Sequence, residues 1–385
     1  MIVTPFSHYL DLLKPDLPDE LISDASFSKI RKVASQVPGA LAFSPFGFEC
    51  PLGVDGAEAD FLFSLQKTNS GPEILSSQLP EHDFDAALFS IPQWNQARCF
   101  GEQWADPPDP LYAGIDDVWL EFDVSNPSAQ QVKAPSLFFA PFHTREHRHG
   151  KIPDPDEGLR LLETVFFCLK GRNPGPSAAL NWKKCLEILP RLPNLFQVGL
   201  MIARSDSDTL RMCILAPDSE AVKRILSDLG WPGDFSPLDD VLKKISPFFD
   251  MLYLHVDVGA DISGKIGIEC KFSYPRDLSP EPLWYPFLDF LLEEGVCLPA
   301  KRNGLLAYPG YRSIDMDACP PPLARMADHL YPLYRSFFVR ILSHVKLVCR
   351  ESGELEAKAY LGINHLWKGI FDDSEPGRGR WGIIG

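Results

Sequence analysis

The chain has 385 residues, of which 45% are hydrophobic and 23% charged, as is typical of a folded globular protein. Its net charge is −15, with 37 basic against 52 acidic residues. A nucleic-acid backbone or an anionic membrane surface requires a basic face on its partner, so we expect neither partner. No apolar run approaches the roughly 20 residues that a membrane-spanning helix needs.

Nine cysteines are scattered along the chain without a Cys-x-x-Cys pair. An odd and dispersed set that falls mostly in apolar runs predicts buried free thiols in a reducing cytoplasm. Residues 1–16 lack the basic stretch and long apolar core of a secretory signal, which also favours a cytoplasmic protein.

Five pairs of strand-like runs recur along the chain, each pair interrupted by a polar or glycine-containing turn. In chain order they cover residues 46–52 with 57–66, 118–124 with 135–142, 196–216, 251–272 and 343–361. Apolar residues at helical spacing lie between them. They predict helices near residues 19–36 and over 156–169, 179–192, 218–231, 237–249, 281–295 and 322–342.

The last pair shows how such a strand divides its faces. In residues 355–361, Glu356, Lys358 and Tyr360 alternate with apolar side chains. Neighbouring side chains point to opposite faces of a strand, so one face is polar and the other apolar.

A helix-strand-strand-helix unit cannot bury both faces of its own hairpin. Antiparallel hairpins stacked side by side can place all helices on one face, and closing the sheet removes its exposed edges. We therefore predict an α+β fold with a closed ten-stranded antiparallel barrel inside a ring of helices. About ten strands leave a chamber, and the polar strand faces would line it.

Five αββα units around such a barrel resemble the aromatic prenyltransferases of the ABBA, or PT-barrel, family over residues 19–371. Fungal indole prenyltransferases carry Lys-x-Tyr pairs on barrel strands, and Lys358-Ala-Tyr360 is similar. They also carry a glutamate on an early strand, and Glu121 in the stretch Trp-Leu-Glu-Phe-Asp is similarly placed.

The resemblance implies one PT-barrel domain over residues 1–385 and a transferase of secondary metabolism. Its donor would be an allylic diphosphate, dimethylallyl or geranyl, and its acceptor an aromatic compound or a peptide. No cofactor is required under this hypothesis, although Mg²⁺ is compatible with it, and we predict no metal-ligating residues.

Alternation along the strands supplies the candidate site. The inward set also includes Glu49, Asp60, Asp123, His255 and His344. Glu121 and Asp257 are the candidate catalytic residues, and Glu121 would hold the nucleophile and accept a proton.

The remaining candidates would bind the substrates. A leaving diphosphate must be neutralised, and an allylic cation needs aromatic faces and exclusion of water. Arg211, Lys271, Lys346 and Lys358 would serve the diphosphate. The other predicted binding residues are Trp119, Glu269 and Tyr360.

Two rival hypotheses remain open. The inward acids outnumber the inward Lys and Arg, which favours a cyclase or isomerase that protonates a substrate without a diphosphate. The third hypothesis is a barrel that binds a small hydrophobic ligand or a peptide and has no activity. A requirement for diphosphate separates the first two, and tight binding without turnover indicates the third.

Other motifs are assigned to the surface or to strands. His143, His147 and His149 have no regularly spaced partner and are expected in a solvated loop. The acidic stretches 115–121 and 371–375 lack the helical setting of Mg²⁺-binding motifs. Residues 299–310 are expected to form a basic surface loop.

Overall fold

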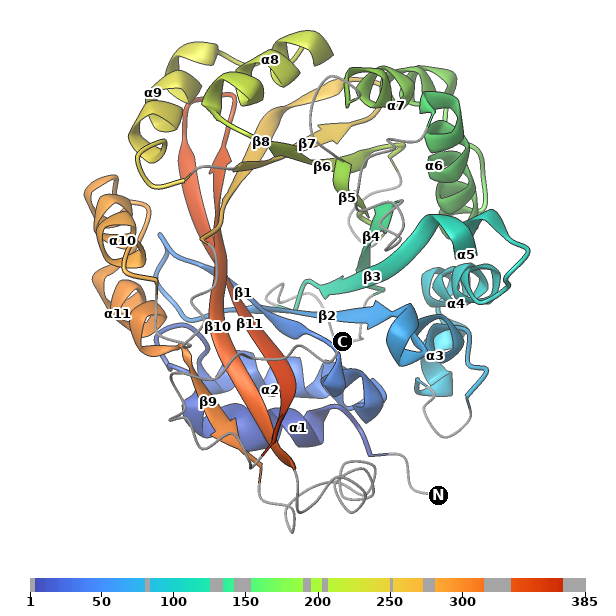
Figure 1. Ribbon diagram of the computed structural model, residues 1–385, viewed down its shortest axis with the longest axis vertical. Helices are drawn as coiled ribbons and strands as arrows, with labels where there is room; N and C mark the ends of the chain where they lie inside the picture. Colours follow the sequence, from blue (N-terminus) through green and yellow to red (C-terminus); the bar gives the residue numbers. More distant parts are fainter. Residues whose placement is uncertain are drawn as a thin grey trace.

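A closed antiparallel β-barrel forms the centre of the molecule (Figure 1). The computed structural model describes residues 4–79, 84–124, 134–141, 154–189, 195–202, 207–249, 252–272, 281–314 and 334–369. Within them, ten strands close in the order β1-β2-β3-β4-β5-β6-β7-β8-β10-β11, and β11 pairs back with β1. The strands are β1 (Phe46–Pro51), β2 (Asp60–Gln66), β3 (Ile115–Phe122), β4 (Ser136–Pro141), β5 (Leu195–Leu200), β6 (Leu210–Ala216), β7 (Leu252–Val258), β8 (Ile262–Cys270), β10 (Tyr334–Cys349) and β11 (Leu355–Gly369). The predicted ten-stranded barrel is confirmed.

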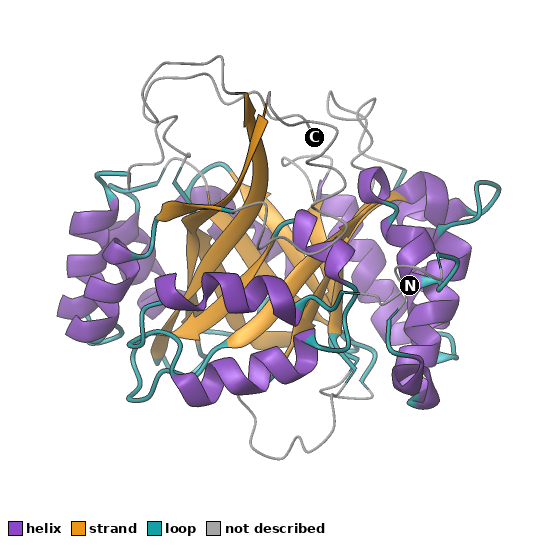
Figure 2. Cartoon of the chain, turned by 90° about the horizontal axis from the view of Figure 1, so that it is seen from below, coloured by secondary structure: helices purple, strands orange, loops and turns teal. Residues whose placement is uncertain are grey.

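Helices surround the barrel on its outside, as two views at right angles show (Figures 1 and 2). They are α1 (Ser7–Leu13), α2 (Asp24–Ala34), α3 (Gly71–Leu75), α4 (Pro92–Trp104), α5 (Pro110–Gly114), α6 (Pro155–Lys170), α7 (Pro176–Ile188), α8 (Ser219–Leu229), α9 (Phe235–Ile245), α10 (Trp284–Glu293) and α11 (Pro299–Ala307). Helices α1, α3, α4 and α5 had no counterpart among the predicted elements.

Helix α8 illustrates how local sequence sets these boundaries. The Asp218 side chain accepts a hydrogen bond of 2.7 Å from the backbone N–H of Ala221, which caps the first turn. The helix ends at Gly230, whose φ of 78° is readily adopted only by glycine. Between the two caps, Val222 and Ile225 are fully buried.

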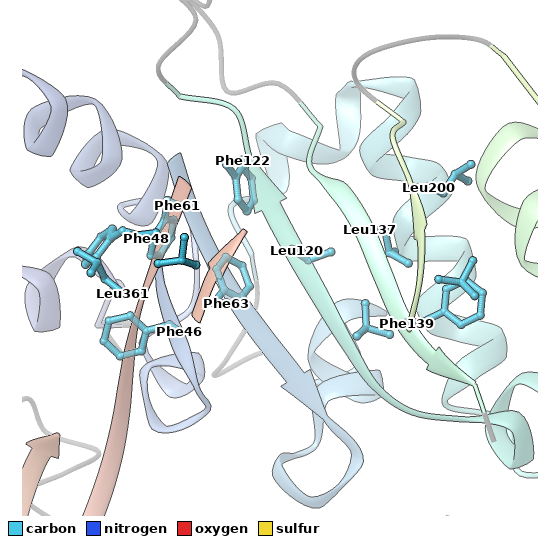
Figure 3. Packing of buried hydrophobic residues seen from close by; sticks show 14 of the residues in the cluster. Phe46, Phe48, Phe61, Phe63, Leu120, Phe122, Leu137, Phe139, Leu200 and Leu361 are labelled. Carbon is cyan, nitrogen blue, oxygen red and sulfur yellow. The ribbon is translucent and has the colours of Figure 1, made fainter. Parts of the chain in front are cut away.

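The outward faces of the strands form the core against the helices. Phe46 and Phe48 of β1 alternate with Glu49, and both phenyl rings are buried. Figure 3 shows them packed with Phe61 and Phe63 of β2. The apolar half of each strand pattern therefore faces the helix ring, and the polar half faces the barrel interior.

A β-bulge in β10 keeps its polar residues inside the barrel. Leu342 pairs with Leu361 of β11, whereas His344 pairs with the next residue, Tyr360, so Ser343 is the extra residue. Before the bulge the even-numbered Phe338 and Leu342 pack in the core. After it the odd-numbered Val345 takes that role, and His344 and Lys346 turn inward.

Two predicted elements are wrong. The helix expected over residues 322–342 is strand over 334–342, because β10 continues in register with β11 as far as Tyr334; the rest of that range lies outside the described residues. The loop expected over residues 299–310 is mostly helix α11. Its Lys301 is buried and donates a 2.6 Å hydrogen bond to the Pro51 carbonyl, so it does not reach solvent.

A further short strand was also not predicted. Strand β9 (Gly310–Ser313) pairs with Phe337–Arg340 of β10, beyond the part of β10 that contacts β8. It extends the sheet outside the closed ring.

Eight cysteines fall among the described residues, and all eight are free. Seven of them are buried, as expected from their apolar sequence context. No helix in the described ranges is long and apolar enough to cross a bilayer.

Candidate active site in the barrel

One pocket opens into the polar interior of the barrel and encloses about 480 Å³, including the solvent at its mouth. Seven strands contribute inward-facing side chains to it: β1, β3, β6, β7, β8, β10 and β11. Its lining residues are Glu49, Glu121, Arg211, His255, Asp257, Lys265, Ile266, Gly267, Lys346, Val348 and Lys358.

Gly267 leaves room for this pocket. It faces inward on β8 between His255 of β7 and Val348 of β10, its two register partners. A Cβ at this position would lie 3.2 Å from the Cβ of His255 and 3.3 Å from the Cδ of Lys346. Any larger residue would therefore crowd both side chains.

Four residues on three adjacent strands form what we call the Glu49 cluster: Glu49, Lys346, Lys358 and Tyr360. Lys358 and the Tyr360 hydroxyl each donate a hydrogen bond to the Glu49 carboxylate, one to each oxygen. Lys346 Nζ donates to the Tyr360 hydroxyl oxygen at 2.7 Å. The register of β1 with β11 places Glu49 directly opposite Tyr360, so the strand pairing builds this contact.

Burial and pairing act in opposite directions on these groups. Burial alone would raise the pKa of Glu49, but the ammonium groups of Lys358 and Lys346 and the two donated hydrogen bonds hold that pKa well below its usual range. Burial lowers the pKa of Lys346. Burial, together with the carboxylates of Glu49, Glu121 and Glu269, raises the pKa of the Tyr360 hydroxyl well above its ordinary value.

A second ion pair lies on strands β6 and β7. Arg211 of β6 and Asp257 of β7 are register partners and form two parallel hydrogen bonds, of 2.7 and 2.9 Å. Burial would raise the pKa of Asp257, but the Arg211 guanidinium lowers it overall. Both oxygens of this carboxylate are thus engaged by one cation.

A third group, which we call the thiol–imidazole cluster, comprises Cys213, His255, Glu269 and His344. His255 Nε2 lies 3.3 Å from Cys213 Sγ and 2.7 Å from Glu269 Oε1. His344 Nε2 is 3.4 Å from the same Glu269 oxygen. The His344 ring stacks on the Tyr360 ring at 4.1 Å and thereby joins this cluster to the Glu49 cluster.

Two pocket lysines have no carboxylate within ion-pair distance among the described residues. Lys346 is buried and contacts only the neutral Tyr360 hydroxyl and ring. Lys265 is more exposed, and partial burial together with the nearby Arg350 and Arg211 lowers its pKa. Carboxylates act on Lys346 only at longer range. Both ammonium groups therefore keep donors that an anion in the pocket would engage.

The structure brings most of the predicted site residues together. Five line the pocket: Glu121, Arg211, Asp257, Lys346 and Lys358. Tyr360 and Glu269 lie directly behind the lining, where they contact Lys346 and His255 respectively.

The other two predicted residues do not line the pocket. Lys271 follows the end of β8 and acts electrostatically on the Cys213 thiol. Trp119 is half-buried on β3, opposite Ser64 and Phe138.

Lys265 was not among the residues predicted from the sequence. Including it changes the balance of basic and acidic side chains that line the pocket. The predicted inward residues of this hairpin are His255, Asp257, Glu269 and Lys271, although Lys265 shares the strand face of Gly267 and Glu269. Extending the alternation by two residues would have found it. The pocket itself has four Lys or Arg and three carboxylates, whereas the inward sequence set had more acids than bases.

The three pocket carboxylates differ in what they can do. Glu49 is held by a lysine and a tyrosine, and Asp257 by an arginine, so both are poor proton acceptors. Glu121 is buried on β3 and lines the pocket from that strand. It acts electrostatically on Lys346 and Lys358.

Two solved structures are similar in fold. The prenyltransferase PriB in its apo form matches with a TM-score of 0.51 at 9% identity, covering 92% of this chain and 93% of that one. The 6-dimethylallyltryptophan synthase from Micromonospora olivasterospora, in complex with DMASPP and Trp, matches with a TM-score of 0.50 at 11% identity, covering 92% and 95%. No protein-family model and no curated protein sequence matches the chain. The strand order, the closed ring and these likenesses together show that this chain has the PT-barrel fold of the aromatic prenyltransferases.

Proposed function

We propose that the protein transfers an allylic group from a diphosphate to an aromatic acceptor in the barrel pocket. The observation that carries this proposal is the pair of lysines, Lys346 and Lys265, that line the pocket without a carboxylate partner among the described residues. Together with Arg211 they place three cations where a diphosphate would need them. The fold is shared with enzymes of this chemistry, one of them bound to DMASPP and Trp.

The reaction divides between the cations and Glu121. The carbon–oxygen bond of the allylic diphosphate breaks with its electron pair going to the diphosphate, which Lys346, Lys265 and Arg211 neutralise. The π electrons of the acceptor ring then form the new bond to the allylic carbon. The ring proton passes to the carboxylate of Glu121.

Asp257 has a supporting role in this proposal. Because its two oxygens hold the Arg211 guanidinium, it orients that cation and does not accept the proton. Lys358 is engaged with Glu49 and completes the charge of the pocket wall. Tyr360 holds Lys346 in position.

Calorimetric titration with a non-hydrolysable dimethylallyl thiolodiphosphate tests the donor site. Lys346→Met keeps the length of the side chain and removes its charge. Loss of one charge-assisted contact, about 1.5–3 kcal/mol, predicts roughly 10- to 100-fold weaker binding. The matched control is Lys301→Met, because Lys301 is also buried but bonds the Pro51 carbonyl outside the pocket.

A second variant separates binding from chemistry. Glu121→Gln should bind the analogue like the wild type and lose turnover with an aromatic acceptor by on the order of 10²-fold or more. Failure of the wild type to bind any allylic diphosphate would overturn the proposal. Turnover of an alkene or epoxide without diphosphate would then indicate a cyclase, and binding without turnover would indicate a carrier.

A further inference from the structure

Three potential metal ligands converge in the thiol–imidazole cluster. Cys213 Sγ, His255 Nε2 and a carboxylate oxygen of Glu269 all lie within 4.8 Å of one another. They come from three consecutive strands, β6, β7 and β8, and Cys213 is the register partner of His255. Ligands on paired strands are held more rigidly than ligands on loops.

A single proton on His255 Nε2 cannot serve both of its neighbours in this arrangement. His255 Nε2 faces both the Cys213 sulfur and the Glu269 oxygen. If Nε2 carries a proton, that proton serves the carboxylate or the sulfur but not both; if it does not, Nε2 and the carboxylate oppose two lone pairs. His255 is 95% buried, since only 5% of it is exposed, and its other nitrogen has no partner within the described residues.

Two of the three distances between ligand atoms are close to those of a tetrahedral site, and the third, between Cys213 and Glu269, is within 4.8 Å. With bonds of about 2.3 Å to sulfur and about 2.0 Å to nitrogen and oxygen, ligand atoms lie roughly 3.3–3.5 Å apart. The Cys213–His255 distance of 3.3 Å already has this value, and the His255–Glu269 distance of 2.7 Å needs to open by about 0.6 Å.

We propose that Cys213, His255 and Glu269 form a binding site for a Zn²⁺-type divalent cation beside the pocket. Thiolate, imidazole and carboxylate are the donors that Zn²⁺ prefers, and three protein ligands leave a fourth position for water or a pocket-bound molecule. His255 itself lines the pocket, so the site adjoins it. Mg²⁺ would not choose a thiolate, so this site is distinct from any Mg²⁺ that accompanies a diphosphate.

The surroundings support the charges of such a site. Thiolate and carboxylate together balance a divalent cation, so the loaded cluster is neutral and the neighbouring Lys346 does not face a net positive charge. His344 contacts the Glu269 carboxylate from the next strand, at 3.4 Å, and its Nδ1 lies 3.1 Å from the Ser343 hydroxyl. It is the nearest ring on β10 to the carboxylate ligand.

Cobalt substitution tests the site without any substrate, and so independently of the proposed transfer. Protein freed of metal with a chelator is titrated with Co²⁺ and then with Zn²⁺. We expect one equivalent to bind, with a thiolate-to-cobalt absorption band and strong visible bands of a four-coordinate ion, and Zn²⁺ to displace it. Cys213→Ala should abolish the thiolate band and weaken Zn²⁺ binding by at least roughly 10-fold.

Two controls make the test specific. Cys185→Ala removes another buried free thiol, on α7 and outside the cluster, and should leave the spectrum unchanged. A variant with His143, His147 and His149 replaced by Ala removes the histidine-rich stretch outside the described residues and should also keep the band. The proposal is wrong if the wild type shows no thiolate–cobalt band, or if either control loses it while Cys213→Ala keeps it.

A second ligand variant guards against misfolding. Glu269→Gln retains the size of the side chain, and its thermal melt in chelator reports whether the barrel folds. A folded Glu269→Gln protein that binds Zn²⁺ as tightly as the wild type would overturn the assignment of Glu269 as a ligand. Weaker binding by a similar factor to Cys213→Ala supports it.

Discussion

The Glu49 cluster and the thiol–imidazole cluster lie side by side on the same barrel wall, joined by the stacked rings of Tyr360 and His344. In the first, a buried carboxylate is matched by two ammonium groups and a hydroxyl, and its pKa is driven down. In the second, burial lowers the pKa of His255, and the imidazoles of His344 and His255 lower the pKa of the Glu269 carboxylate.

The difference shows that polar side chains inside a barrel can be held in two ways, as paired opposite charges or as a cluster without such a pair. Fixed opposite charges hold one another, and removing one leaves the other buried and uncompensated. The second cluster has no fixed pair of opposite charges, so removing its neutral Cys213 thiol leaves no newly uncompensated charge. Its thiol, imidazole and carboxylate remain available to a cation. The first cluster is therefore expected to stabilise the fold, and the second to bind.

The largest expected effect comes from breaking the ion pair of the Glu49 cluster. Lys358→Met leaves Glu49, 3% exposed, without its direct cation. We expect a loss of about 3–5 kcal/mol in the free energy of unfolding at pH 7, measured by urea denaturation. Affinity for the thiolodiphosphate analogue should change less than in Lys346→Met.

A double variant sharpens this measurement. Glu49→Gln combined with Lys358→Met removes both charges, and its destabilisation should be smaller than the sum of the two single effects. A Lys358→Met protein that is as stable as the wild type but no longer binds the analogue would make Lys358 a diphosphate ligand and not a structural partner.

Asp117 on β3 is a buried carboxylate whose pKa is raised, in contrast to the lowered pKa of Glu49. Burial and the adjacent Asp116 raise its pKa to about 6, against a backbone hydrogen bond from Ala140, and its Oδ1 has no partner in the described structure. The folded state therefore binds the proton more tightly than the unfolded state, whose pKa is near 3.8. Stability is lost as pH rises from about 4 to 6.

The Asp117→Asn variant has no carboxyl group at this position, so it should not lose stability as pH rises from about 4 to 6. The stability of the variant relative to the wild type should rise between pH 4 and pH 8 by up to about 3 kcal/mol, measured by urea denaturation at each pH. Asp261→Asn, which changes an exposed aspartate, is the control and should show no such trend. A difference that is constant with pH would mean that Asp117 has no raised pKa.

The smallest effect is expected in the thiol–imidazole cluster. In metal-free protein, Cys213→Ala removes a neutral buried group and should cost about 1–2 kcal/mol of unfolding free energy. One substitution in the Glu49 cluster is thus expected to cost at least about 1 kcal/mol more than one in the thiol–imidazole cluster. Addition of Zn²⁺ should widen the gap between Cys213→Ala and the wild type in thermal melts, and an unchanged gap would show that no ligand was lost.

Much of the barrel could be predicted because strand alternation is local. Lys358 and Tyr360 were assigned to the inner face from their neighbours alone, and Ala357 and Ala359 to the outer core, as the structure confirms. The helix expected over residues 322–342 failed because apolar spacing in a stretch rich in Phe, Val and Ile fits a helix or a strand equally. Pairing with β11 decided it.

The bulge in β10 shows a second limit. Even-numbered residues of β10 face the core before Ser343, and odd-numbered residues face it afterwards. Counting every second residue from Phe338 would therefore have placed Lys346 on the outer face. Such a shift depends on the partner strand, which the sequence of β10 does not contain. The predicted face of Lys346 was correct because the alternation was counted only from residue 343.

The sequence by itself determined the number of hairpins and which face of most strands is polar, because both follow from short-range pattern and turn chemistry. Only the tertiary structure decided which polar residues meet. Glu49 and Lys358 are 309 residues apart and become neighbours when β1 closes the ring onto β11. Ring closure depends on long-range strand pairing, and so the free lysines of the pocket and the convergence of Cys213, His255 and Glu269 appear only in the folded barrel.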